Sequence, residues 1–162
     1  MENKKTISVL VENQPGVLAR IAGLFSGRDF NIESLAVGET EEPSISRMTI
    51  VARGDEIVLG QIVKQLNKLI DVIKVLDMSG ENYVERELAL VRVNVEGKNR
   101  GGLMDIVEIF RGKVLDVFSD AYMVEITGTD DKIEAFIDAV RPYGVKEMIR
   151  TGTVALLRGK RK

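Results

Sequence analysis

Two kinds of hydrophobic period follow one another near the start of this chain. Residues Ile7, Val9 and Val11 alternate with polar positions, which predicts a half-buried strand over about 5–12. Apolar residues then recur at helical spacing and predict an amphipathic helix over about 15–28. The residues on its apolar stripe are Val17, Leu18, Ile21, Leu24 and Phe25.

The first half of the chain continues as two strands, a helix and a strand. Strands are predicted over about 30–38 and 46–53, joined by an acidic hairpin loop at 39–44. The run Gly54-Asp55-Glu56 ends the second of these strands and begins a helix, with acidic residues in its first turn. That helix has an apolar stripe, and a strand over 72–78 follows it. The stripe consists of Leu59, Ile62, Val63, Leu66 and Leu69.

The same order of elements repeats in the second half. A strand over 88–95 precedes a helix that opens at Asn99-Arg100-Gly101-Gly102, and strands follow over about 114–118 and 122–127. Gly128-Thr129-Asp130 repeats the earlier break, and a helix and a strand from about 145 close the unit. We therefore predict an α+β protein with two ferredoxin-like βαββαβ domains in tandem, over 1–79 and 80–162, with a linker at 80–82.

A short turn joins the first strand to the first helix and offers an anion site. Pro15 suits a first helical turn, and Gly16 leaves the backbone amides of that turn open to close approach. The positive end of the helix dipole lies there, so a carboxylate is a natural ligand. The same residues also fit an ordinary tight turn between a strand and a helix.

Composition excludes several classes of function. With 162 residues and a formal net charge of -2, the chain has no strong field to attract nucleic acid or membrane. No apolar run approaches the ~20 residues of a spanning helix, and no signal-peptide pattern opens the chain, so a cytoplasmic protein is expected. Histidine and cysteine are absent from the sequence, and neither a nucleophile elbow nor a Walker loop occurs.

Ferredoxin-like sheets also bind RNA, through aromatic side chains on their central strands. The corresponding segments here, 88–95 and 48–53, contain no aromatic residue. We therefore expect no nucleic-acid binding.

Several motifs resemble one known family over essentially the whole chain. Residues 7–20, ISVLVENQPGVLAR, resemble the opening of an ACT domain, an amino-acid-sensing module. The runs NIESL at 31–35 and SRMT at 46–49 are more specific and resemble the small regulatory subunits of acetolactate synthase. The second half is similar through VEREL at 84–88 and IFRG at 109–112. Position 15 is often a small polar residue in that family, so proline is expected to stiffen the turn.

The resemblance implies a subunit without a catalytic site. In that family a large partner subunit carries thiamine diphosphate, Mg²⁺ and FAD and condenses pyruvate with a second 2-oxo acid, in branched-chain amino acid biosynthesis. The small subunit activates this partner and confers feedback inhibition, usually by valine. No cofactor is expected in this chain. A free-standing ACT sensor that controls another enzyme or a promoter is the alternative.

The resemblance also implies an effector site shared by two copies, in a homodimer or a larger homo-oligomer. Asn13, Gly16, Val17 and Leu18 of one copy are expected to face Asn31 and Ile32 of the other. Backbone amides near Gly16 would bind the carboxylate of a free amino acid, and the two asparagines would bind its polar groups.

Each of these residues has a simpler local interpretation. Asn13 could cap the helix, Asn31 could serve the turn after residue 30, and the three apolar residues could be core. The acidic loop at 39–44 could bind a divalent cation or be a solvated hairpin tip.

Overall fold

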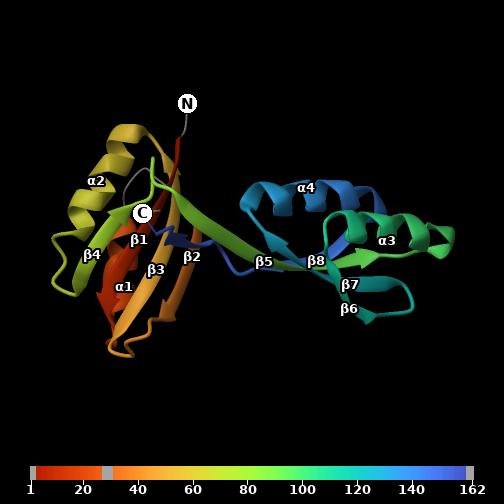
Figure 1. Cartoon of the computed structure of the whole chain (residues 1–162), viewed down its shortest axis with the longest axis horizontal. Helices are drawn as coiled ribbons and strands as arrows, with labels where there is room; N and C mark the ends of the chain where they lie inside the picture. The colour runs from red at the N-terminus through yellow and green to blue at the C-terminus, as the bar shows by residue number, and fades with distance from the viewer. Residues whose placement is uncertain (1–2, 27–30, 160–162) are drawn as a thin grey trace. The chain divides into compact units, whose positions relative to one another are not determined.

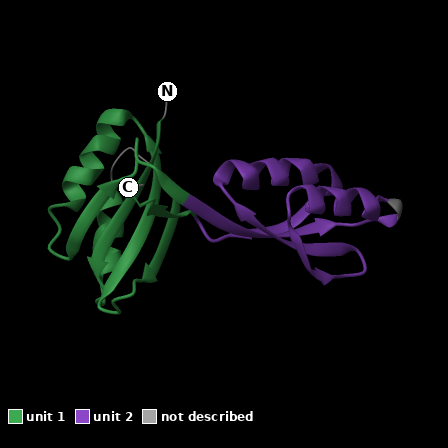
Figure 2. Ribbon diagram, in the orientation of Figure 1, with its two compact units in different colours: residues 1–84, 153–162 green, residues 85–152 purple. Residues whose placement is uncertain are grey.

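A computed structural model describes residues 3–26 and 31–159 of the chain (Figure 1). Its contacts divide the chain into two compact units, one of residues 1–84 and 153–162, the other of residues 85–152 (Figure 2). The segment from Thr153, which the repeat of element order assigns to the second domain, packs with the first unit in the structure. No helix in the described ranges is long and apolar enough to cross a membrane.

The first unit is a four-stranded antiparallel sheet with two helices, in the order βαββαβ. Its strands lie side by side as β2-β3-β1-β4, so β2 and β4 form the two edges. The elements are β1 (Asn3–Glu12), α1 (Val17–Phe25), β2 (Asn31–Glu39), β3 (Ile45–Gly54), α2 (Glu56–Leu66) and β4 (Val72–Asp77).

One face of this sheet and the two helices form a single core. Ile7 and Val9 of β1 pair with Ile50 and Met48 of β3, and all four side chains are buried. Residues from both helices complete the core, as the period-two and helical patterns predict. The helical members of the buried cluster are Val17, Ile21, Phe25, Leu59, Ile62 and Leu66.

The opposite face of the first sheet contacts the end of the chain. A short strand, β9 (Val154–Leu157), contacts β1 there. The backbone N–H of Thr153 donates to the Ser34 hydroxyl at 2.8 Å, and the N–H of Arg158 donates to the Asn82 carbonyl at 2.9 Å. The last segment therefore completes the first unit.

The second unit repeats the βαββαβ order, with its strands side by side as β6-β7-β5-β8. Its core includes Phe110 and Phe136, whose rings meet edge to face at 5.6 Å. The elements are β5 (Tyr83–Asn94), η1 (Gly97–Asn99), α3 (Arg100–Ile109), β6 (Lys113–Val117), β7 (Ala121–Gly128), α4 (Asp130–Val140), η2 (Arg141–Tyr143) and β8 (Val145–Arg150).

A buried ion pair ties β5 to β8 in the second unit. Arg150 donates from Nε and Nη2 to the two carboxylate oxygens of Glu87, at 2.7 and 2.9 Å. Glu87 is almost fully buried, and Arg150 also binds Asp130 and Glu134 of α4. The Glu87 hydrogen bonds, above all, hold the pKa of Arg150 above its ordinary value, against the opposing effect of burial.

The α+β class and the two βαββαβ repeats are confirmed, and several predicted boundaries are corrected. Pro15 lies before α1 rather than in its first turn, α2 ends before Leu69, and β5 begins at Tyr83, earlier than the predicted 88. Beyond Gly152 the chain forms β9 as a separate strand. The predicted end of the first helix and start of the next strand fall on residues 27–30, which lie outside the described residues.

Candidate functional site

The turn before α1 has the open amides that the sequence predicts. Gly16 is the N-cap residue and adopts φ 85°, a left-handed conformation that glycine reaches without steric cost. No side chain caps the helix, although Val17 N–H makes a long 3.4 Å bond to the Gln14 carbonyl. Unpaired N–H groups at the start of a helix attract anions.

A guanidinium group also lies beside this turn. The Nη1 atom of Arg20 is 3.4 Å from the position that a Cβ on Gly16 would occupy. Arg20 is held by Asp71, through a 2.5 Å contact from Nε to Oδ2. No local sequence signal identifies Arg20 as part of the site, because its position depends on a carboxylate 51 residues away.

Asn13 does not cap α1, so that alternative is wrong. Its side-chain amide donates to Glu39 Oε1 at 3.1 Å and to the Pro43 carbonyl at 2.9 Å. Its backbone N–H donates to the Ser44 carbonyl at 2.8 Å. Asn13 therefore fastens the turn before α1 to the hairpin between β2 and β3.

The apolar residues of the predicted site have different environments. Val17 is 2% exposed and belongs to the core of the first unit, as its periodicity allows. Leu18 is 47% exposed and is the apolar side chain next to the turn that remains accessible. Ile32 is half-buried at the edge of the same core.

Within one chain, Asn31 lies far from the turn before α1. Asn31 and Glu39 are the two ends of β2, about 26 Å apart in an extended strand. Glu39 contacts Asn13, so the turn is at the Glu39 end, and the Asn31 end pairs with Arg53. The structure therefore brings Asn13, Gly16 and Leu18 to one end of β2 and places Asn31 and Ile32 at the other.

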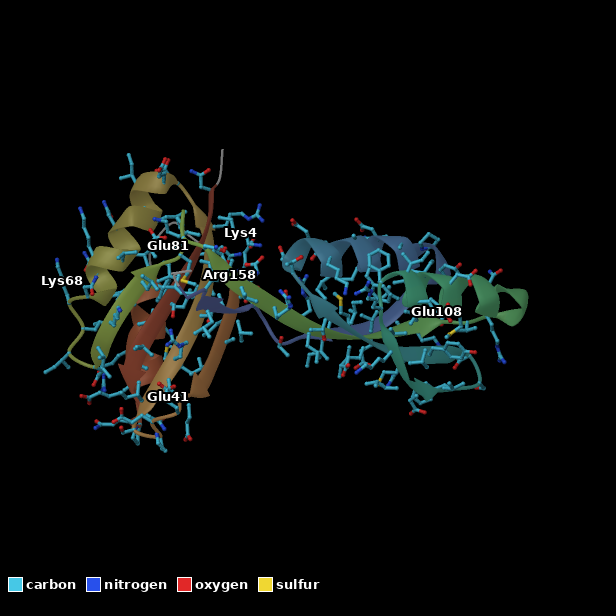
Figure 3. The ribbon with its side chains drawn as sticks, viewed as in Figure 1. Lys4, Glu41, Lys68, Glu81, Glu108 and Arg158 are labelled. Atoms are coloured by element: carbon cyan, nitrogen blue, oxygen red, sulfur yellow. The ribbon has the colours of Figure 1, made fainter. Side chains whose placement is uncertain are left out.

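The acidic hairpin loop satisfies its own polar groups. Thr40 donates to the Glu42 and Ile45 carbonyls, and Ser44 donates to the Glu42 carboxylate. Glu41 lies at this hairpin (Figure 3). In the described ranges no group of three or more acidic, histidine or cysteine residues is placed to hold a metal ion.

Comparisons with known proteins place both units in one family. Residues 86–159 match the family model of the small subunit of acetolactate synthase. Residues 7–74 match the model of the ACT domain of such small subunits.

Relatives match over nearly the whole chain. A probable acetolactate synthase small subunit from Archaeoglobus fulgidus is 55% identical over 159 residues, which cover 98% of this chain and 99% of that protein. The acetolactate synthase small subunit of Aquifex aeolicus is 54% identical over 156 residues, which cover 96% of this chain and 81% of that protein. The crystal structure of the acetolactate synthase small subunit from Thermotoga maritima is 43% identical, with a TM-score of 0.87 over 98% of this chain and 99% of that one. The chain belongs to the family of acetolactate synthase small subunits.

Proposed function

We propose that this chain is the regulatory subunit of a two-component acetolactate synthase. It binds a catalytic large subunit, raises its activity and confers feedback inhibition by valine. The large subunit supplies thiamine diphosphate, Mg²⁺ and FAD, and this chain catalyses no reaction by itself. The observation that carries the proposal is the family match over both units, because a free-standing sensor would need only the ACT unit.

The effector carboxylate binds at the start of α1. The open amides after Gly16 and the guanidinium of Arg20 both attract a negative charge there. Because Arg20 is already paired with Asp71, the site adds little net charge and suits a zwitterion.

A second copy of the chain completes the site. The edge strand β2 has one unpaired side and two half-exposed apolar residues, Leu35 and Val37. The other edge, β4, is shorter and carries Lys74, a residue that discourages strand pairing. An antiparallel pair of β2 strands puts the Asn31 end of one copy beside the Glu39 end of the other, where Asn13 and Gly16 lie.

The branched side chain of valine contacts Leu18 of one copy and Ile32 of the other. Leu18 is exposed and Ile32 is half-buried, whereas Val17 contributes by packing the first turn into the core. Each methylene buried there contributes ~0.8 kcal/mol, which favours valine over alanine. Asn13 and Asn31 provide oxygens that accept from the ammonium group.

A titration of the catalytic subunit from the same organism tests the proposal. Acetolactate formation from pyruvate is measured at increasing concentrations of this chain, with and without valine. We expect no product from this chain alone, a saturable rise in activity on mixing, and valine inhibition only in the mixture. Turnover by the isolated chain, or unchanged activity on mixing, would contradict the proposal. Valine binding without any effect on the catalytic subunit would favour the free-standing sensor.

A further inference from the structure

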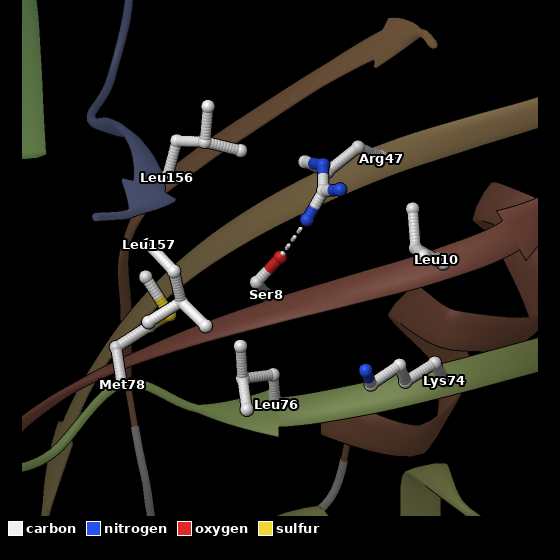
Figure 4. Close-up of a pocket in the computed structure, with 8 residues that line it drawn as sticks. All are labelled: Ser8, Leu10, Arg47, Lys74, Leu76, Met78, Leu156 and Leu157. Carbon is white, nitrogen blue, oxygen red and sulfur yellow. Dashed lines mark hydrogen bonds between the residues drawn. The ribbon is translucent and has the colours of Figure 1, made fainter. Parts of the chain in front are cut away.

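The face of the first sheet that is turned away from α1 and α2 contains a pocket of about 150 Å³. Its walls come from β1, β3, β4 and the C-terminal strand β9 (Figure 4). All of these strands belong to the first unit. The lining residues are Ser8, Leu10, Arg47, Lys74, Leu76, Met78, Leu156 and Leu157.

The polar part of the pocket is cationic. Arg47 Nη1 donates to the Ser8 hydroxyl at 2.9 Å, and Ser8 is 2% exposed. Ser8 accepts this bond, so its own proton is available to a ligand. Neither Arg47 nor Lys74 forms an ion pair with a carboxylate within residues 3–26 and 31–159, and no acidic residue lines the pocket. Two positive charges therefore face it without a negative partner.

The rest of the wall is aliphatic. Leu76 and Met78 are contributed by β4 and the residue after it, and Leu156 and Leu157 of β9 close the other side. Figure 4 shows these side chains beside the paired Ser8 and Arg47 groups. A cationic group next to an aliphatic wall fits a ligand with a carboxylate at one end and a short hydrocarbon at the other.

Size and charge narrow the class of ligand. A protein cavity of about 150 Å³ holds benzene, so a molecule of about six to eight non-hydrogen atoms fits here, allowing for the open side. An ammonium group would meet Arg47 and Lys74 and no carboxylate, which disfavours an amino acid. We propose that this pocket binds a short aliphatic monocarboxylate that has no amino group.

This pocket is independent of the proposed effector site. It needs neither a second copy nor the catalytic subunit, because one chain provides all eight lining residues. Its occupant would also hold β9 against the sheet, since Leu156 and Leu157 form part of the wall. A ligand that binds the folded chain and not the unfolded chain raises the free energy of unfolding, and the increase grows with the logarithm of the ligand concentration.

The test uses the full chain by itself, with isovalerate as the probe and methyl NMR as the readout. We expect isovalerate to shift the methyl signals of Leu76, Leu156 and Leu157. By these signals, which report on the pocket and not on the effector site, isovalerate should bind at least about tenfold more tightly than valine or the neutral isovaleramide. No binding, equal binding of isovaleramide, or shifts confined to Leu18 and Ile32 would overturn the proposal.

Two variants and a matched control locate the site. Lys74→Gln removes an exposed charge from the pocket and should weaken isovalerate binding about tenfold, the loss of one charged hydrogen bond. Lys68→Gln changes the same residue type in the turn after α2, away from the pocket, and should bind as the parent does (Figure 3). Leu156→Glu, at a side chain that is 60% exposed, should also abolish binding without unfolding the chain. Equal affinities in all three variants would contradict the assignment.

Discussion

Gly16 at the start of α1 has both a positive φ and no side chain, and no other residue type combines the two without strain. Its φ of 85° strains any residue with a Cβ, by roughly 1–2 kcal/mol, and its missing side chain leaves room beside Arg20. Gly16→Asp should therefore abolish valine inhibition, because the new carboxylate takes the place of the effector's own. Inhibition is measured in the mixture with the catalytic subunit.

Gly23→Asp is the matched control for this variant. Gly23 lies on the same helix, and a Cβ there would meet no atom within 4 Å. We expect Gly23→Asp to keep valine inhibition and both variants to keep activating the catalytic subunit. Normal inhibition in Gly16→Asp would mean that the carboxylate binds elsewhere.

Arg150 of the second unit forms ion pairs with three carboxylates, one of which, Glu87, is buried. Arg150→Gln leaves the buried Glu87 without its main partner and should lower the free energy of unfolding by about 3–5 kcal/mol. Arg141→Gln removes an exposed pair with Asp138 and should change it by less than about 1 kcal/mol. Urea unfolding monitored by circular dichroism distinguishes the two.

Replacing both partners provides the internal check. A Glu87→Leu, Arg150→Leu double variant should recover most of the stability that Arg150→Gln loses, because no buried charge is left unpaired. If the double variant is as unstable as Arg150→Gln, packing rather than charge accounts for the loss.

The sequence predicts the burial or exposure of a residue only where neighbouring residues along the chain determine it. The period of the first helix places Val17 in the core, and a glycine before a helix predicts open amides. The partners of Asn13 and Arg20 lie 26 to 51 residues away along the chain, so no local signal identifies them.

At the scale of elements, the two edges of the first sheet differ in their ability to pair with another chain. Val37 of β2 and Ile73 of β4 are both about half exposed. Val37→Asp should convert the proposed homodimer to monomers and weaken valine inhibition, because a charge on β2 opposes pairing with a second copy. Ile73→Asp, the same kind of change on the other edge, should leave the mass in sedimentation velocity unchanged. The reverse result would assign the interface to β4.

The sequence patterns predict the order of the elements, but they do not predict where β5 begins or that β9 is separate from β8. The predicted start of β5 at 88 passes over Glu85, Arg86 and Glu87, whose charges argue against a buried strand. Two distant segments make the longer strand possible: β9 pairs with β5, and Arg150 neutralises Glu87. Gly152, with φ 83°, turns the chain out of β8 and leaves β9 to pack on the first unit.

At the scale of the whole molecule, stability of the first unit should depend on the last segment. A chain that ends at Gly152 lacks β9 and uncovers Met78, which is 1% exposed in the intact chain. We expect the first unit to lose about 2 kcal/mol, roughly the burial of one leucine side chain. A chain that ends at Arg158 keeps β9 and serves as the control, and urea unfolding measures both. Equal stability of the two chains would contradict this dependence.

The return of β9 to the first unit also sets an order of events during translation. Residues 1–84 leave the ribosome well before residues 153–157, and the entire second unit is made in between. Throughout that interval the nascent first sheet keeps one face without its covering strand, a state in which partly folded chains aggregate or recruit chaperones. A nascent chain on a ribosome that stalls within the second unit therefore has a first unit without β9, however long that unit is given to fold.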